Sequence, residues 1–160
     1  MKKFRLFILF AFLSFSLLIG KAQVYTGGSF TMLDNSGSTF IHIAPEIGVN
    51  LNDKFALGGN VSYYHINGAS DFSFTPYARL TFFREGLLNL FADACVNLYW
   101  SDPELYFGAG IIPGILLKTN TAFSFFVKCG YLGYSDTPVN QSSGISLSAT
   151  NLNVGFYYNF

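Results

Sequence analysis

The sequence predicts an all-β protein, an eight-stranded antiparallel up-and-down transmembrane β-barrel. Three observations predict it. Apolar and polar residues alternate with a period of two along most of the chain. Only 11% of the residues are charged, against about 25% in soluble domains, while 51% are hydrophobic and 19% aromatic. The N-terminal segment resembles an export signal, and only helices and closed barrels satisfy their backbone hydrogen bonds in lipid.

The N-terminal segment is interpreted as a secretory signal peptide. Three basic residues lie among the first five, and an apolar stretch follows at 6–19. The small residues Gly20 and Ala22 come next, as at a cleavage site. We expect cleavage after Ala22, which divides the chain into a signal peptide at 1–22 and a barrel domain at 23–160. A retained anchor helix is the alternative, but a spanning helix needs roughly 20 apolar residues.

Cleavage would change the charge of the protein. The whole chain has nine basic and nine acidic residues, and the mature chain would keep five basic and all nine acidic ones, a net charge of −4. Such a balance excludes the basic footprint of a nucleic-acid-binding protein. Gly, Asn, Ser or a charge interrupts every later apolar run, so no second segment resembles a transmembrane helix.

The alternation predicts eight strands of about the length that a tilted membrane strand needs. They are expected at 24–33, 39–51, 55–66, 72–83, 88–100, 105–117, 121–134 and 145–160. The connections alternate in kind. Tight turns are expected at 52–54, 84–87 and 118–120, and longer polar loops at 34–38, 67–71, 101–104 and 135–144. Short turns at one rim and longer loops at the other are typical of an up-and-down barrel.

The composition of the two strand faces indicates which one is inside. One parity carries Ile, Leu, Val and Phe almost continuously, and the other carries Gly, Ser, Asn, Thr and Tyr with few charges. A soluble lipocalin-like barrel also alternates, but this polar face would make a poor water-facing surface. It suits a narrow interior filled by side chains. We therefore expect the apolar face to contact lipid.

Three prolines fit the pattern badly. Pro45, Pro76 and Pro113 fall inside expected strands and share the apolar parity. Proline cannot donate a ladder hydrogen bond, and a closed barrel has no free edge. We expect local bulges or ladder breaks at these positions.

The two cysteines are expected to stay unpaired. Export would permit a disulfide, but Cys95 falls on the polar parity and Cys129 on the apolar one. A bulge could shift one phase and undo this argument.

Several segments resemble the small outer-membrane β-barrel-domain family of Gram-negative bacteria, akin to outer membrane protein X and the barrel of outer membrane protein A. They read APEIGVNLNDKFALGGNVSYY, TPYARLTFF and IIPGILL, and the chain ends LNVGFYYNF. The resemblance covers most of 24–160. It implies an outer-membrane location, eight strands, and recognition of the terminal aromatic residue by the barrel-assembly machinery, with Phe160 at that position preceded by Tyr158 and Phe156. The short outer loops depart from outer membrane protein X and argue against adhesion by a protruding sheet.

Four charges fall on the polar parity: Glu46, Arg79, Asp93 and Lys128. Each lies roughly six to nine residues from a tight turn, so they could meet at similar depth at about 3.3 Å per residue. Buried charges persist only when paired and hydrogen-bonded, and Arg79 and Asp93, on adjacent strands, are the expected pair. A structural network that locks the barrel is favoured over a charged constriction in a pore.

The expected outer loops carry acids and no basic residue: Asp34, Asp71, Asp102, Glu104 and Asp136. This acidic rim could attract divalent cations or basic partners, or it could serve only to keep exposed loops soluble, which is the favoured reading. The lack of basic residues argues against binding of lipopolysaccharide phosphates by the rim.

Enzymatic activity is not expected. A hydrolase needs a nucleophile, a base and an orienting acid within hydrogen-bond reach. His42 and Glu46 share a face, but four strand residues span about 13 Å, and His65 falls on the outward parity. No Cys or His spacing indicates a metal site, and no cofactor is expected.

The sequence therefore predicts a monomeric, envelope-stabilising or interacting barrel whose partners are outer-membrane lipids and the assembly machinery. A narrow porin-like channel for small solutes is the alternative, and a lipid-modifying enzyme the second alternative.

Overall fold

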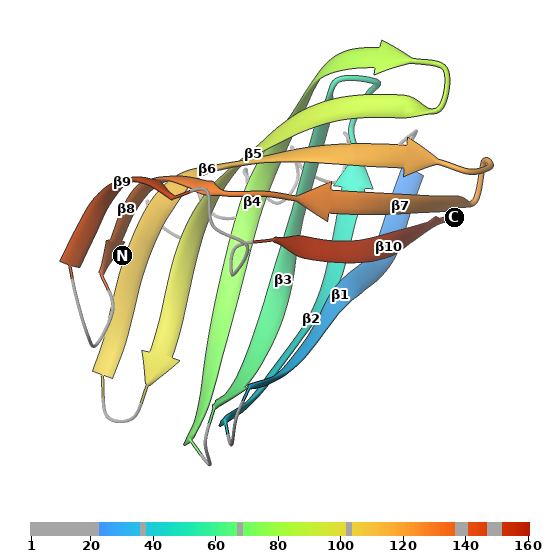
Figure 1. Cartoon of the computed structure of the whole chain (residues 1–160). Coiled ribbons are helices and arrows are strands. Elements are labelled where there is room, and N and C mark those ends of the chain that lie inside the picture. The colour runs from blue at the N-terminus through green and yellow to red at the C-terminus, as the bar shows by residue number, and fades with distance from the viewer. Residues whose placement is uncertain (1–22, 36–37, 67–68, 102–103, 137–140, 147–151) are drawn as a thin grey trace, which may run out of the picture.

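The computed structural model describes residues 23–35, 38–66, 69–101, 104–136, 141–146 and 152–160. Every regular element in this part of the chain is a β-strand, and the strands form one antiparallel sheet that closes into an eight-stranded up-and-down barrel (Figure 1). This confirms the predicted eight-stranded antiparallel up-and-down barrel. The expected signal peptide at 1–22 lies outside the described residues.

The sheet is built from ten strand segments. They are β1 (Gln23–Asn35), β2 (Ser38–Asn50), β3 (Phe55–Ile66), β4 (Ala69–Glu85), β5 (Leu88–Ser101), β6 (Glu104–Lys118), β7 (Phe123–Lys128), β8 (Tyr131–Asp136), β9 (Gln141–Ser146) and β10 (Asn153–Asn159).

Ten segments fill eight positions in the barrel because two positions are divided. β6 pairs with both β7 and β8, which therefore form the seventh position. β7 pairs with β10, and β8 pairs with β9, which together form the eighth. The barrel closes where β10 pairs with β1, with Tyr25 opposite Asn159 and Ser29 opposite Gly155. The first and last strands thus meet in the wall.

The expected asymmetry between short turns and longer loops is wrong. Consecutive strands are separated by only two residues at 36–37, 67–68 and 102–103, and by four at 137–140. The other end has connections at 51–54, 86–87 and 119–122, which are no shorter. Polar residues expected in loops continue the ladders instead, as in the pairs Asn35 with Ser38 and Ser101 with Glu104. The eighth position likewise begins at Gln141 rather than at 145.

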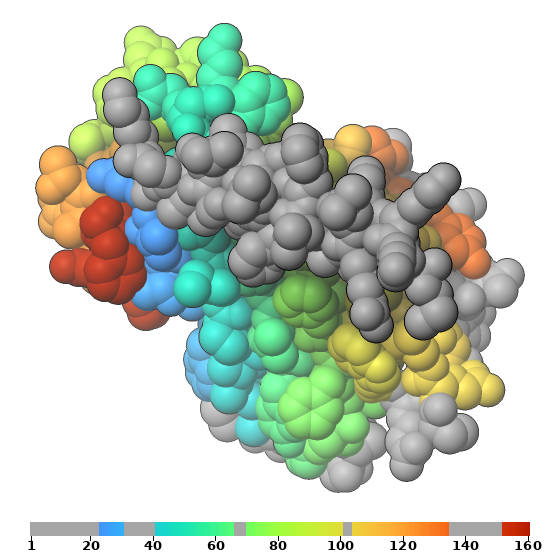
Figure 2. Space-filling model, turned by 180° about the vertical axis from the view of Figure 1, so that it is seen from behind, coloured from blue at the N-terminus to red at the C-terminus, as the bar shows by residue number. Residues whose placement is uncertain are grey.

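The apolar parity faces outward, as the composition of the two faces predicted. Ile47 on β2 is 62% exposed, and large apolar residues are exposed on the neighbouring strands as well. Side chains from successive strands form the outer surface in the space-filling view (Figure 2). The buried residues come from the other parity and include Tyr25, Ser29, Glu46, Ser62, Thr75, Tyr77, Arg79, Phe91, Asp93, Ser124, Phe126, Lys128 and Tyr157.

Two prolines interrupt ladders without changing the register. Between β2 and β3, the pairs on either side of Pro45 are Ile43 with Tyr63 and Glu46 with Asn60. Between β4 and β5, the pair Phe74 with Leu98 is followed next by Tyr77 with Cys95, so Pro76 is skipped. In both cases the ladder is broken on the side of the following strand. A residue other than proline would donate its backbone N–H to that strand.

The third proline faces a bulge. Ile111 pairs with Leu132 and Gly114 with Lys128, so the neighbouring strand carries one extra residue opposite Pro113. The extra residue is accommodated at Cys129–Gly130, where Gly130 adopts a φ of 75° that favours glycine, and the Cys129 N–H donates to the Pro113 carbonyl at 3.0 Å. The prediction of bulges or ladder breaks at the prolines is therefore confirmed.

The cysteines are unpaired, as the strand phases predicted. Cys95 is buried inside the barrel, and Cys129 lies in the bulge.

Gly114 provides a test of the packing inside the barrel. A Cβ atom at this position would overlap the Phe91 ring, which is buried and cannot move away. We expect Gly114→Ala to lower the free energy of unfolding by about 1–3 kcal/mol through overpacking, measured by urea unfolding of the refolded protein. Gly59→Ala is the matched control, because Gly59 has only the Phe74 ring edge, at 3.3 Å, close by. Equal effects of the two substitutions would contradict this packing.

Candidate functional site: an interior charge cluster

The structure brings Glu46, Arg79, Asp93 and Lys128 together inside the barrel. They come from β2, β4, β5 and β7, and none of them is more than 6% exposed. We call these four residues the interior charge cluster. Each lies on the polar parity of its strand, so the pleat alone points it inward.

Arg79 and Asp93 form the closest pair of the cluster. They stand directly opposite each other in the β4–β5 ladder. The Arg79 Nε and Nη2 atoms donate to the two carboxylate oxygens of Asp93 at 2.7 and 2.8 Å. This two-bond geometry is the strong form of an arginine–carboxylate pair, and it joins the two residues expected to pair from their strand positions.

Lys128 links the two acids from another strand. Its Nζ atom lies 2.9 Å from Glu46 Oε2 and 3.2 Å from Asp93 Oδ2. Arg79 Nη2 lies 3.4 Å from Glu46 Oε1, which completes a cycle of alternating charges. Two acids and two bases balance, so the cluster carries no net charge while every member has an opposite partner.

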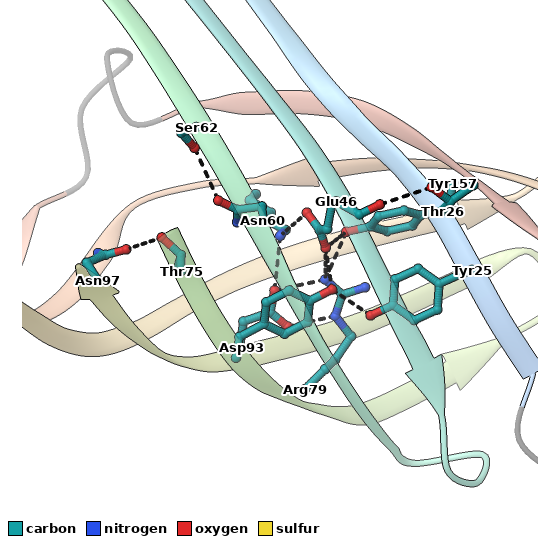
Figure 3. Close-up of polar contacts among 12 residues, drawn as sticks. Tyr25, Thr26, Glu46, Asn60, Ser62, Thr75, Arg79, Asp93, Asn97 and Tyr157 are labelled. Carbon is teal, nitrogen blue, oxygen red and sulfur yellow. Dashed lines mark hydrogen bonds and ion pairs between the residues drawn. The ribbon is translucent and has the colours of Figure 1, made fainter. Parts of the chain in front are cut away.

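Three tyrosine hydroxyls extend the cluster (Figure 3). Tyr77 and Tyr157 both donate to Glu46 Oε1, the latter at 2.6 Å. Because the Tyr77 hydrogen points to Glu46, the contact of 2.6 Å between the Tyr25 and Tyr77 hydroxyls has Tyr25 as donor. Arg79 Nη2 also donates to the Tyr157 oxygen at 3.0 Å. The polar groups of six strand segments are thereby joined across the interior.

Aromatic rings surround the two cations. The Arg79 guanidinium carbon lies 4.0 Å from the centre of the Phe91 ring. Lys128 Nζ lies 4.9 Å from the Tyr77 ring and 5.2 Å from the Phe126 ring. These are cation–π distances. The rings exclude water from the ion pairs and so strengthen them.

Glycines make room for these rings. Four direct cross-strand pairs place a ring opposite a glycine: Tyr25 with Gly48, Tyr77 with Gly58, Phe91 with Gly114, and Phe126 with Gly155. A Cβ atom on any of the four glycines would overlap the facing ring. This role of the aromatic residues was not predicted from the sequence. An aromatic residue on the polar parity that faces a glycine in register is the signal that could have revealed it.

Phe156, Tyr158 and Phe160, the expected assembly signal, face outward. Phe156 stacks on Phe123 with ring centres 5.5 Å apart, and Tyr158 meets Phe160 edge-on at 5.0 Å. The Phe160 N–H donates to the Val24 carbonyl at 2.9 Å, which ties the chain end to β1. The residues implied as an assembly signal are thus exposed on one outer face.

The structure does not gather the acidic residues into loops. Asp34, Asp71, Glu104 and Asp136 belong to strands, so their expected loop location is wrong, because the ladders extend further than the polar composition indicated. Asp71 accepts a hydrogen bond from the Tyr99 hydroxyl at 2.7 Å, and Glu104 accepts one from Tyr106 at 2.6 Å. Asp102 and the side chains of Asp34 and Asp136 lie outside the described part of the chain.

The two histidines lie on opposite sides of the wall. His42 stacks on Tyr64 inside the barrel, with ring centres 4.4 Å apart. On the outer parity, His65 Nδ1 lies 3.0 Å from the Ser70 hydroxyl oxygen, which also contacts the Tyr63 hydroxyl at 3.0 Å. Within the described ranges, no carboxylate is hydrogen-bonded to His65, and no group of three or more His, Cys, Asp or Glu side chains is arranged to hold a metal ion.

Comparison with known proteins gives no match, either to a protein-family model or to a curated protein. Among the residues that the structure describes, no helix has the length and hydropathy required to cross a membrane.

Asp93→Ala tests whether the cluster stabilises the barrel. The substitution leaves Arg79 without its two-bond partner in a buried site, so we expect the free energy of unfolding in urea to fall by about 3–5 kcal/mol. Asp53→Ala is the matched control, since Asp53 pairs with Arg84 at 3.1 Å in an exposed position, where an ion pair contributes little. An unchanged urea midpoint for Asp93→Ala would rule out a stabilising role of the cluster.

Proposed function

We propose that this protein is an integral outer-membrane β-barrel with an envelope-stabilising or interaction role, whose lumen is closed by the interior charge cluster and the rings around it. In this proposal the protein performs no catalytic step. The observation that carries it is the division of side chains across the wall: large apolar residues cover the outside, while the four charged residues of the cluster are buried inside.

The exterior supports contact with lipid. A water-soluble protein rarely exposes contiguous apolar surface of more than a few hundred Å². Here exposed aliphatic or aromatic residues occur on the outward rows of β2, β3, β4, β6 and β10, including Ile43, Val61, Leu80, Leu105 and Val154. Burying these rows in acyl chains would remove the cost of their hydration.

The strand lengths fit a membrane. The first six strands have 12 to 17 residues. At about 3.3 Å per residue, even a 12-residue strand is about 40 Å long. Tilted by about 40°, it still spans about 30 Å, the thickness of the hydrocarbon core.

The interior supports a closed lumen. Phe91, Phe126, Tyr157 and Tyr25 are each at most 3% exposed, and the cluster beside them is fully paired. An eight-stranded barrel is narrow enough for its interior to be filled by side chains.

The outer membrane is proposed from the N-terminal segment and the C-terminal residues. Export through a cleaved signal at 1–22, recognition of Phe160 by the barrel-assembly machinery, and the resemblance to the small outer-membrane barrel-domain family all agree with this location. The exposed position of Phe156, Tyr158 and Phe160 leaves them accessible to an assembly partner.

Refolding in detergent tests the membrane proposal. We expect the mature chain, residues 23–160, to need detergent or lipid to remain monomeric in solution, because its apolar rows are exposed. The folded barrel should migrate faster than the boiled protein on a gel and should sediment with outer membranes after expression with its N-terminal segment. A mature protein that is monomeric and soluble in buffer alone would contradict the proposal.

A narrow channel is the second candidate, favoured by a cavity of about 750 Å³ that reaches the cluster from one end of the barrel. Planar-bilayer recordings distinguish a closed barrel from a channel. We expect no resolved conductance steps for the wild-type protein, and new steps for Tyr157→Ala, which removes a buried ring from the closed section. Tyr158→Ala is the control, because Tyr158, the residue after Tyr157, faces outward. Regular steps in the wild-type protein would favour the channel instead.

A further inference from the structure

A polar cavity opens at the end of the barrel that carries the turns 51–54, 86–87 and 119–122. Its volume is about 750 Å³, within the range of small-ligand sites. Its floor is the near side of the closed section, where Tyr25, Arg79 and Tyr157 line it. We call this cavity the turn-end vestibule. The vestibule therefore lies on one side of the interior charge cluster.

Two polar side chains that have no protein hydrogen-bond partner among the described residues line the turn-end vestibule. Asn89 is only 4% exposed and lines the cavity, yet its side-chain amide makes no hydrogen bond to any residue in the described ranges. Ser124, 1% exposed, also lines the cavity, and its hydroxyl has no such bond either. Because both side chains line the cavity, their polar groups are available to bond to a solute or to water inside it.

Besides Arg79 in the floor, two further cations line the vestibule. Lys118 lies at the end of β6 on the inner parity, and no carboxylate of the described residues lies within ion-pair distance of its Nζ atom. Arg84 also lines the vestibule, where its one carboxylate partner is the exposed Asp53. An exposed pair of this kind is weak and screened by salt, so it leaves Arg84 available to an incoming anion.

A bulge is what points Arg84 into the vestibule. Strict alternation from Arg79 would place Arg84 on the outer face with Leu80 and Phe82. The β4–β5 register shifts by one residue between Thr81 and Phe83, and both Phe82 and Phe83 are exposed. Bulges are a known means of redirecting a side chain, and here the one extra residue adds Arg84 to Lys118 and Arg79 in the lining of the cavity.

We propose that the turn-end vestibule binds a small oxyanion, a solute carrying a carboxylate or a phosphate, through Lys118, Arg84 and the Asn89 amide. Ammonium, guanidinium and amide N–H groups are all donors to oxyanions. Asp53 is the one acid in the lining, and its side chain is almost fully exposed. The proposal rests on the barrel interior alone, so it does not depend on the proposed membrane location.

Titration of the refolded wild-type protein with sodium phosphate tests this proposal. Ionic strength is held constant by replacing sodium chloride, and amide signals are followed by NMR. We expect saturable shifts confined to the Asn89 side-chain amide and to residues around Lys118 and Ser124. A parallel titration with sodium acetate distinguishes the two sources of the oxyanion, and saturable binding of either supports the proposal.

Two substitutions make the test specific. Lys118→Gln and Arg84→Gln should each weaken the apparent affinity about ten-fold, because each removes a charged hydrogen-bond donor. Lys54→Gln is the matched control, since Lys54 is an exposed lysine at the same end that does not line the cavity. If Lys118→Gln fails to fold, Arg84→Gln gives the same comparison. Shifts that do not saturate with either anion, or equal weakening by the lining and control variants, would overturn the proposal.

Discussion

Charge pairing in the interior is the constraint on which the rest of this barrel depends. Four ionised groups can stay away from water only because each meets an opposite charge within 3.4 Å or less. The Arg79–Asp93 pair fixes the β4–β5 register, and Lys128 brings β7 within reach of both acids. A one-residue slip of any of these strands would turn a charge toward the apolar exterior, so the cluster specifies the register of the wall as well as filling its centre.

The rings around the cluster impose a second condition, which concerns the size of the residue opposite each ring rather than its charge. Four large interior rings each face a glycine across the ladder, so a narrow barrel can hold both the rings and the ion pairs. The combination explains why a polar interior contains so much aromatic area. Tyr77 and Tyr157 serve both purposes, since their rings fill space and their hydroxyls satisfy Glu46. At this depth of the barrel, the same side chains therefore fill the interior and satisfy its buried polar groups.

Irregularities in the ladders have local consequences that a regular barrel would lack. The breaks at Pro45 and Pro76 leave the register intact, whereas the bulge opposite Pro113 adds a residue to the seventh position and divides it into β7 and β8. The bulge at Phe82 changes the lining of the interior instead, because it turns Arg84 from the outer face to the vestibule. Single inserted residues thus decide both where the seventh position is divided and which charges reach the interior.

The sequence by itself determined the barrel fold, the approximate positions of its eight strands, the outward and inward faces, the ladder irregularities at the three prolines and the pairing of Arg79 with Asp93. It could do so because all of these follow from the two-residue period of a strand, which is a local property. Only the tertiary structure decided that the polar end segments continue as strands, that Lys128 bridges both acids, that rings sit over glycines, and that Arg84 faces inward. These outcomes depend on register and bulges between strands, and register is set by contacts between residues far apart in the chain.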